Sequence, residues 1–143
     1  AYIYQSMAAY FEGNNFKGFA KWMDVQAKEE QEHARKMYEY IFAKGGKVTL
    51  EGIDAPKLTW KNAEEVFKES LGHEQAVTKS IEKIYSLARK ESDYATEIFL
   101  QWFITEQVEE EDNATSILEK IKLLGVTNNA SMYLLDKELG ERA

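Results

Sequence analysis

Apolar residues recur at steps of three and four along three long stretches of the chain, which is the spacing of one face of an α-helix. The first stripe is Phe19, Met23, Gln26, Glu30, His33, Met37 and Ile41. The second is Phe67, Leu71, Glu74, Val77 or Thr78, Ile81, Ile84 and Ala88. The third is Phe99, Phe103, Glu106, Glu110, Asn113, Ile117, Ile121 and Leu124. Each stripe predicts a long amphipathic helix that buries this face against its neighbours.

Glycines and asparagines divide the chain into five predicted helices. Gly13-Asn14-Asn15 ends the first, Gly45-Gly46 ends the second, and Thr59 offers an N-cap for the third. The predicted helices cover about residues 1–12, 16–44, 59–90, 92–125 and 130–139. Between the second and third lies a long connection, residues 47–58, which holds the only proline. This order predicts an all-α fold: a four-helix bundle with one long crossover connection and a short fifth, C-terminal helix.

Size and composition limit the classes of function. A length of 143 residues fits one domain. The absence of cysteine excludes zinc-thiolate sites, iron–sulfur clusters, thiol nucleophiles and disulfides, and it suits a reducing cytoplasm. A net charge of −7 opposes binding to phosphate backbones and favours cations. Since no stretch is apolar enough to span a bilayer and no signal-peptide pattern opens the chain, we expect a cytoplasmic protein with no nucleic-acid or membrane partner.

Polar residues interrupt each stripe near its middle. Glu30 and His33 interrupt the first, Glu74 the second, and Glu106 and Glu110 the third. Burying unpaired carboxylates is costly, and a bound metal ion would supply the missing positive charge. A Glu-x-x-His pair facing into a bundle is a ligand pattern of di-iron carboxylate proteins. Carboxylates with one imidazole suit iron or manganese better than a soft metal.

Several residues near these positions have two interpretations. Glu106, Glu109 and Glu110 share one helix face and could converge on a cation, whereas Glu111 and Asp112 are expected on a solvated acidic surface. Glu29 is turned about 100° from Glu30 and could border a neighbouring metal position. Tyr4 and Trp102 are expected to pack in the core, or to donate an electron beside an oxidising metal pair. His73 is expected off the stripe and not as a ligand.

Five motifs together match one known family. They are residues 2–11 (YIYQSMAAYF), 26–34 (QAKEEQEHA), His73-Glu74, 99–111 (FLQWFITEQVEEE) and 134–139 (LLDKEL). On these motifs the chain resembles the non-haem ferritins of bacteria and archaea over essentially its whole length. We therefore expect residues 1–143 to form one ferritin-like di-iron domain.

The resemblance implies an activity. Ferritins of this kind oxidise ferrous iron with dioxygen at a di-iron centre inside each subunit, and they store the ferric mineral in a hollow homo-oligomeric cage of 24 subunits. By resemblance, Glu30 bridges two irons, His33 binds the first, and Glu74 and Glu110 bind the second. Gln107 lies close to the bound oxygen or metal, and Tyr4 matches a tyrosine beside the centre. A third iron position would draw on Glu29, Glu106, Glu109 and Glu110.

One departure from the family concerns the first helix. There the first iron also takes a Glu that would lie three residues before Ala1, so the first helix looks N-terminally truncated. Either the protein lacks this residue, or the printed sequence omits it; if the protein lacks it, the first iron keeps only Glu30 and His33 and binds more weakly.

Two other functional classes are alternatives. A rubrerythrin-like di-iron peroxidase pairs two Glu-x-x-His motifs, whereas this chain has Gln107-x-x-Glu110 in the corresponding helix and no cysteines. A metal-free helical scaffold would need the inward carboxylates to be misassigned to the core face. A DNA-protecting mini-ferritin is a further relative, but its metal sites form between subunits, and no basic tail is visible here.

Overall fold

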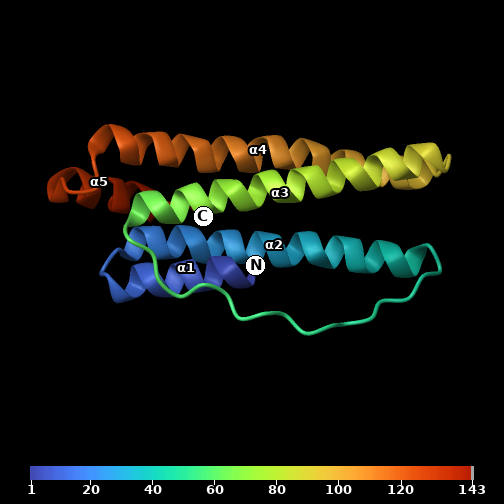
Figure 1. Cartoon of the computed structure of the whole chain (residues 1–143), viewed down its shortest axis with the longest axis horizontal. Helices are drawn as coiled ribbons and strands as arrows, with labels where there is room; N and C mark the ends of the chain where they lie inside the picture. The colour runs from blue at the N-terminus through green and yellow to red at the C-terminus, as the bar shows by residue number, and fades with distance from the viewer. Residues whose placement is uncertain (143) are drawn as a thin grey trace. The chain divides into compact units, whose positions relative to one another are not determined.

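The computed structural model describes residues 1–142 and contains five α-helices in that part of the chain (Figure 1). They are α1 (Tyr2–Gly13), α2 (Lys17–Ala43), α3 (Ala63–Lys90), α4 (Tyr94–Leu124) and α5 (Asn129–Leu139). Residues 1–142 form no strand, which confirms the all-α prediction. Across the same residues, no helix has the length and apolarity needed to cross a membrane. The helices divide into two compact units: unit 1 is residues 1–60 with the chain from residue 128 onward, and unit 2 is residues 61–127.

Unit 1 is built around an aromatic cluster between α1 and α2. Phe11 and Phe19 are both fully buried, and their stacked rings lie 4.9 Å apart. The ring of Phe16, at the start of α2, meets that of Phe19 edge-on at 5.5 Å. Met7 on α1 and Met23 on α2, whose side chains are flexible and polarisable, are also fully buried. The predicted stripe therefore forms the core over the first half of α2.

Helix α5 completes unit 1 by capping α2. The α2 helix has no side-chain cap of its own, since Phe16 stands at its N-cap. Instead, Asp136 Oδ1 accepts hydrogen bonds from the backbone N–H of Gly18 (2.9 Å) and of Phe19 (3.0 Å). Carboxylates stabilise helix N-termini through these orphan donors and the helix dipole. Gly18 permits the approach, because a Cβ there would lie only 1.6 Å from the Asp136 carbonyl oxygen.

The long connection between α2 and α3 is confirmed. Residues 44–62 form no helix or strand, and Figure 1 shows them returning along α2. The connection leaves α2 through Gly45, whose φ of +77° favours glycine. Ser6 on α1 donates a hydrogen bond to the Lys57 carbonyl at 2.6 Å, and Trp60 meets Tyr10 edge-on at 5.4 Å. These contacts hold the returning segment against α1.

Unit 2 is an antiparallel hairpin of α3 and α4, joined by a tight turn at residues 91–93 (Figure 1). Asp93 caps α4 by accepting from the backbone N–H of Thr96 at 3.2 Å. The large apolar residues buried in the hairpin are Val66, Phe67, Ile81, Leu100, Phe103, Ile117, Leu118 and Ile121. The predicted start of α3 at Thr59 is wrong by four residues. Asn62 is the cap, because its Oδ1 accepts from Glu65 N–H at 3.0 Å, and the Glu65 carboxylate accepts from the N–H of the preceding residue, Lys61, at 2.5 Å.

The predicted stripes hold near the helix middles and fail towards some ends. Ile41 is 40% exposed and Ile84 is 45% exposed, although both were placed on buried faces. In α3 the buried position near that end is Ala88, while Tyr85 is half-buried. A step of three or four residues only approximates the 3.6-residue turn, so a stripe extended over seven positions drifts off the packed face.

Candidate metal centre

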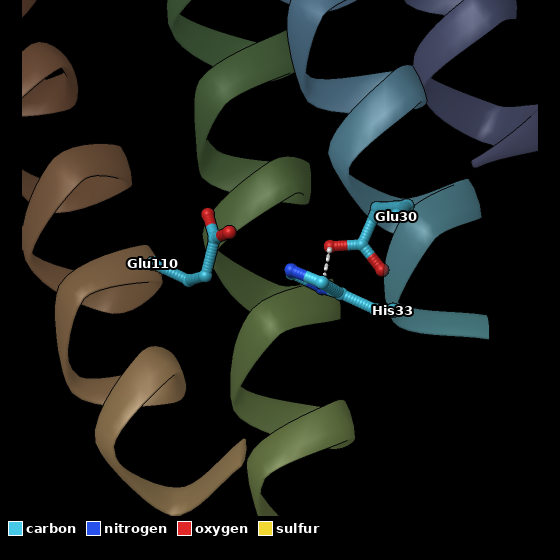
Figure 2. A group of neighbouring side chains, drawn as sticks. All are labelled: Glu30, His33 and Glu110. Carbon is cyan, nitrogen blue, oxygen red and sulfur yellow. Dashed lines mark ion pairs between the residues drawn. The ribbon is translucent and has the colours of Figure 1, made fainter. Parts of the chain in front are cut away.

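The α2 part of the candidate site consists of Glu30 and His33 (Figure 2). Their side chains are 15% and 12% exposed, and His33 Nδ1 lies 3.6 Å from Glu30 Oε1. This separation is too long for a hydrogen bond. Glu30 Oε1 is buried and has no hydrogen-bond partner within residues 1–142. A buried carboxylate oxygen without a donor carries a desolvation cost that a coordinated cation would offset, so the atom suits a metal ligand.

Arg142 holds the side chains of Glu29, which directly precedes Glu30, and of Gln26, one turn before it. The Arg142 guanidinium donates to Gln26 Oε1 at 2.9 Å, forms an ion pair with Glu29, and stacks over the Trp22 ring at 4.4 Å. Glu29, expected at a third iron position, is thus paired with a cation from the chain itself. The helical periodicity gave no sign of Arg142, which follows α5 outside any stripe.

The hairpin contributes a second group of polar side chains, from facing turns of α3 and α4. Glu74, Gln107 and Glu110 are 2%, 2% and 4% exposed. Gln107 Nε2 lies 3.2 Å from both the carbonyl oxygen and the carboxylate Oε2 of Glu74. The buried positions of Glu74 and Glu110 agree with their place on the predicted stripes. Two buried carboxylates on one hairpin again favour a cation nearby.

Thr78 and Glu111 extend this group, and neither was expected to contribute. Thr78 Oγ1 donates to Glu111 Oε1 at 2.6 Å and accepts from Gln107 Nε2 at 3.2 Å. Glu111 is half-buried, so it keeps part of the solvent access expected of an acidic surface, but it is also bonded across the hairpin, which the sequence did not predict. The available signal was the spacing, since Thr78 follows Glu74 by one turn and Glu111 follows Gln107 by one turn.

The other predicted residues occupy varied environments. Tyr4 is buried in unit 1 at 3% exposure, Glu106 is half-buried, and Glu109 and Asp112 are exposed. The Trp102 ring meets that of Phe103 edge-on at 4.8 Å. His73 Nε2 lies 3.8 Å from Glu69 Oε1, one turn away on α3, and its side chain is 43% exposed.

Comparison with known proteins decides the family. A model of the ferritin family, described as a ferritin-like domain, matches residues 1–124. The chain belongs to the ferritin family. It is 41% identical over 142 residues to the bacterial non-heme ferritin of Staphylococcus aureus strain USA300, covering 99% of this chain and 85% of that protein. The corresponding protein of Staphylococcus haemolyticus is 40% identical over 143 residues, covering 100% and 86%.

Solved ferritin structures match the chain equally well. An open-pore ferritin from the archaeon Archaeoglobus fulgidus superposes with a TM-score of 0.97 at 42% identity, covering 99% of this chain and 86% of that one. A closed form of the same ferritin, engineered by mutagenesis, gives 0.97 at 43% identity, covering 99% and 86%. The fold is therefore the four-helix bundle of the ferritins with its short C-terminal helix, as predicted.

Proposed function

We propose that this ferritin oxidises ferrous iron with dioxygen and stores the ferric product inside a homo-oligomeric cage. The observation that carries the proposal is the buried Glu30 Oε1, which has no hydrogen-bond partner within residues 1–142. It stands beside His33, in a chain whose relatives are non-heme ferritins. A rubrerythrin-like peroxidase or a metal-free scaffold accounts less well for this combination of relatives and buried carboxylates.

In this proposal the two groups of side chains bind two ferrous ions, which are the substrate. Glu30 bridges them, His33 binds the first, and Glu74 and Glu110 bind the second, with Gln107 beside them. Two-metal sites hold their ions about 3.5–4 Å apart. Dioxygen takes one electron from each ion, and the hard carboxylate oxygens favour the more highly charged ferric product. Burial of Glu74 and Glu110 limits the water around the ions.

Two further roles belong to the same proposal. Tyr4, buried in unit 1, donates an electron during oxidation. Glu29, Glu106, Glu109 and Glu110 bind a third iron. Since Glu29 is paired with Arg142, this ion pair has to open before Glu29 can take part.

The cage itself is also proposed. The matching archaeal structure is described as an open-pore ferritin, and we infer a cage of 24 subunits from the family resemblance. Large apolar side chains that a single subunit leaves exposed fit such an assembly, notably Ile98 (69%), Val108 (71%) and Leu123 (86%). We place the assembled protein in the cytoplasm, with no nucleic-acid or membrane partner.

Iron retained per subunit after aerobic ferrous loading and desalting tests the function. We expect many ions per chain, together with oxygen consumption on iron addition. Retention of two ions or fewer would instead indicate a di-iron enzyme without storage, and the absence of any metal-dependent rise in melting temperature would support a scaffold.

Replacing one ligand tests the centre. Glu110→Ala removes a buried carboxylate, so we expect at least a tenfold slower initial rate of oxidation with the cage still assembled, as a lost metal ligand or its support typically costs about 10–100-fold. Asp112→Ala is the matched control, because Asp112 is exposed two residues further along α4 and carries the same charge. Equal rates for the two variants would remove Glu110 from the centre.

A further inference from the structure

We propose that Thr78 and Glu111 are positioning residues that fix the orientation of the Gln107 side-chain amide, so that its oxygen is presented to iron. The inference rests on the proposed function, and it adds two residues that touch neither iron nor dioxygen. Both belong to the α3–α4 hairpin, as does Gln107, and all their contacts described here lie within unit 2.

Glu111 determines how the Thr78 hydroxyl is used. An ionised carboxylate can only accept hydrogen bonds, whereas a hydroxyl has one hydrogen to donate. The 2.6 Å contact from Thr78 Oγ1 to Glu111 Oε1 therefore uses the hydrogen of Thr78. The second acceptor near this hydroxyl, the Glu74 carbonyl at 3.0 Å, competes for the same hydrogen. Thr78 is left able only to accept from the third group, Gln107.

The acceptors around Gln107 determine which way its amide faces. Its amide atom on this side lies 3.2 Å from three oxygens: the Glu74 carbonyl, Glu74 Oε2 and Thr78 Oγ1. Each of these must accept a hydrogen bond, so the atom facing them is Nε2. A flipped amide would place its oxygen against two acceptors of Glu74 and a hydroxyl whose hydrogen is already used. Such a buried arrangement loses its hydrogen bonds and is strongly disfavoured.

With Nε2 held in this way, Gln107 Oε1 takes no part in the three bonds. Gln107 and Glu110 lie one turn apart on the buried face of α4, so the amide oxygen belongs to the same face as a proposed iron ligand. Carbonyl-type oxygen is a suitable ligand for a hard ion, while an amide N–H would repel one. The hydrogen-bond chain thus decides whether Gln107 assists or opposes metal binding.

A pocket within the hairpin explains why Glu111 can serve as the fixed end of this chain. Thr78, Gln107 and Glu111 line a cavity of about 250 Å³ together with Ile81, Glu82 and Ile104. Glu111 is only half-buried there, so its carboxylate keeps access to solvent. A charge at the rim of a pocket is retained at much lower cost than one in the core.

Thr78→Val tests the proposal, since valine keeps the shape and removes the hydroxyl. We expect the initial rate of ferrous oxidation to fall roughly three- to tenfold, as for the loss of one oriented hydrogen bond, with KM for ferrous iron raised. Thr78→Ser keeps the hydroxyl and should recover most of the rate. Thr105→Val is the matched control, because Thr105 donates to the Gln101 carbonyl one turn back on the exposed side of α4 and so lies outside the Thr78–Gln107 hydrogen bonds.

A double-mutant cycle separates positioning from general stability. If Thr78 acts through Gln107, Thr78→Val will cause no further loss of rate in a Gln107→Leu background. Additive losses would overturn the proposal. At the other end of the chain, Glu111→Gln retains an acceptor oxygen and should lose less activity than Glu111→Leu; equal losses would count against Glu111.

Cobalt(II) binding supplies a readout that does not depend on oxidation. The visible absorption of bound cobalt reports its ligands, so Thr78→Val should change the spectrum and Thr78→Ser should restore it. If the wild-type protein binds cobalt but oxidises no ferrous iron, the proposed function is refuted. The cobalt spectra of the Thr78 variants would still test whether Thr78 positions Gln107. Identical spectra for wild type and Thr78→Val would overturn the inference even if oxidation proceeds normally.

Discussion

The most informative single residue outside the predicted stripes is Arg142. It ties the segment after α5 to the middle of α2 through Gln26, Glu29 and the face of Trp22. A guanidinium suits this place because it can donate in two directions while stacking on an aromatic ring, which an ammonium cannot do. Its side chain is 20% exposed, so water weakens these contacts only in part.

We predict that Arg142→Met lowers the free energy of unfolding by about 1–2 kcal/mol, as expected for charge-assisted hydrogen bonds in a partly buried setting. Arg142→Lys should recover less than half of this loss. Urea denaturation followed by circular dichroism measures both.

Arg35 provides the control for this prediction. It also pairs with a glutamate, Glu39 at 2.6 Å, and lies 5.0 Å from the Tyr38 ring centre, but its side chain is 66% exposed. Exposed pairs contribute little, so Arg35→Met should change stability by less than about 0.5 kcal/mol. Equal losses for the two variants would show that the partial burial of Arg142 is of no consequence.

At this scale the sequence predicted which side chains turn inward but not what they contact. Periodicity placed Glu74 and Glu110 on buried faces, because burial follows from helix geometry. Gln107 entered only through resemblance to a family, since it stands between two stripe positions. The hydrogen bond between Thr78 and Glu111 was not predicted, because it crosses from α3 to α4. The relative rotation of two helices depends on their packing, which the pattern of a single helix does not contain.

At the scale of elements, the start of α3 shows which of two residues is the N-cap of this helix. The sequence favoured Thr59, whereas the structure uses Asn62, whose Oδ1 accepts from Glu65 N–H while the Glu65 side chain accepts from Lys61 N–H. We predict that Asn62→Ala destabilises the protein by about 1 kcal/mol, the usual cost of losing such a cap.

Thr59→Ala is the natural comparison, since Thr59 is exposed and precedes the helix by four residues. It should leave the denaturation midpoint unchanged. A larger loss of stability from Thr59→Ala than from Asn62→Ala would indicate that α3 begins at Thr59 after all. The error arose because a β-branched residue and an asparagine three positions apart both satisfy the local rule, and only the glutamate that follows Asn62 distinguishes them.

At the scale of the whole molecule, we predict that the purified protein assembles. Exposed apolar side chains of the size seen at Ile98 and Leu123 are unfavourable in water and favour burial between subunits. Size-exclusion chromatography with light scattering should give a mass many times the 16.5 kDa of one chain. A stable species of 16.5 kDa that still oxidises iron would separate the centre from the cage.

The fold class was predictable from sequence because five helices, one long connection and a short last helix leave few arrangements open. The division into two units was not. It depends on which helices pair most closely, and the three long stripes are compatible with several pairings.

Unit 1 combines segments from both ends of the chain, and this also determines the order in which the two units can fold during synthesis. The α3–α4 hairpin is continuous in sequence, so it can close while later residues are still being added by the ribosome. Unit 1 cannot, because the carboxylate that caps α2 is separated by 118 residues from the amide it accepts. Until Asp136 emerges from the ribosome, the N–H groups of Gly18 and Phe19 lack their carboxylate cap. Unit 1 also lacks α5 until then. The earliest part of the chain to be made is thus the last to be finished.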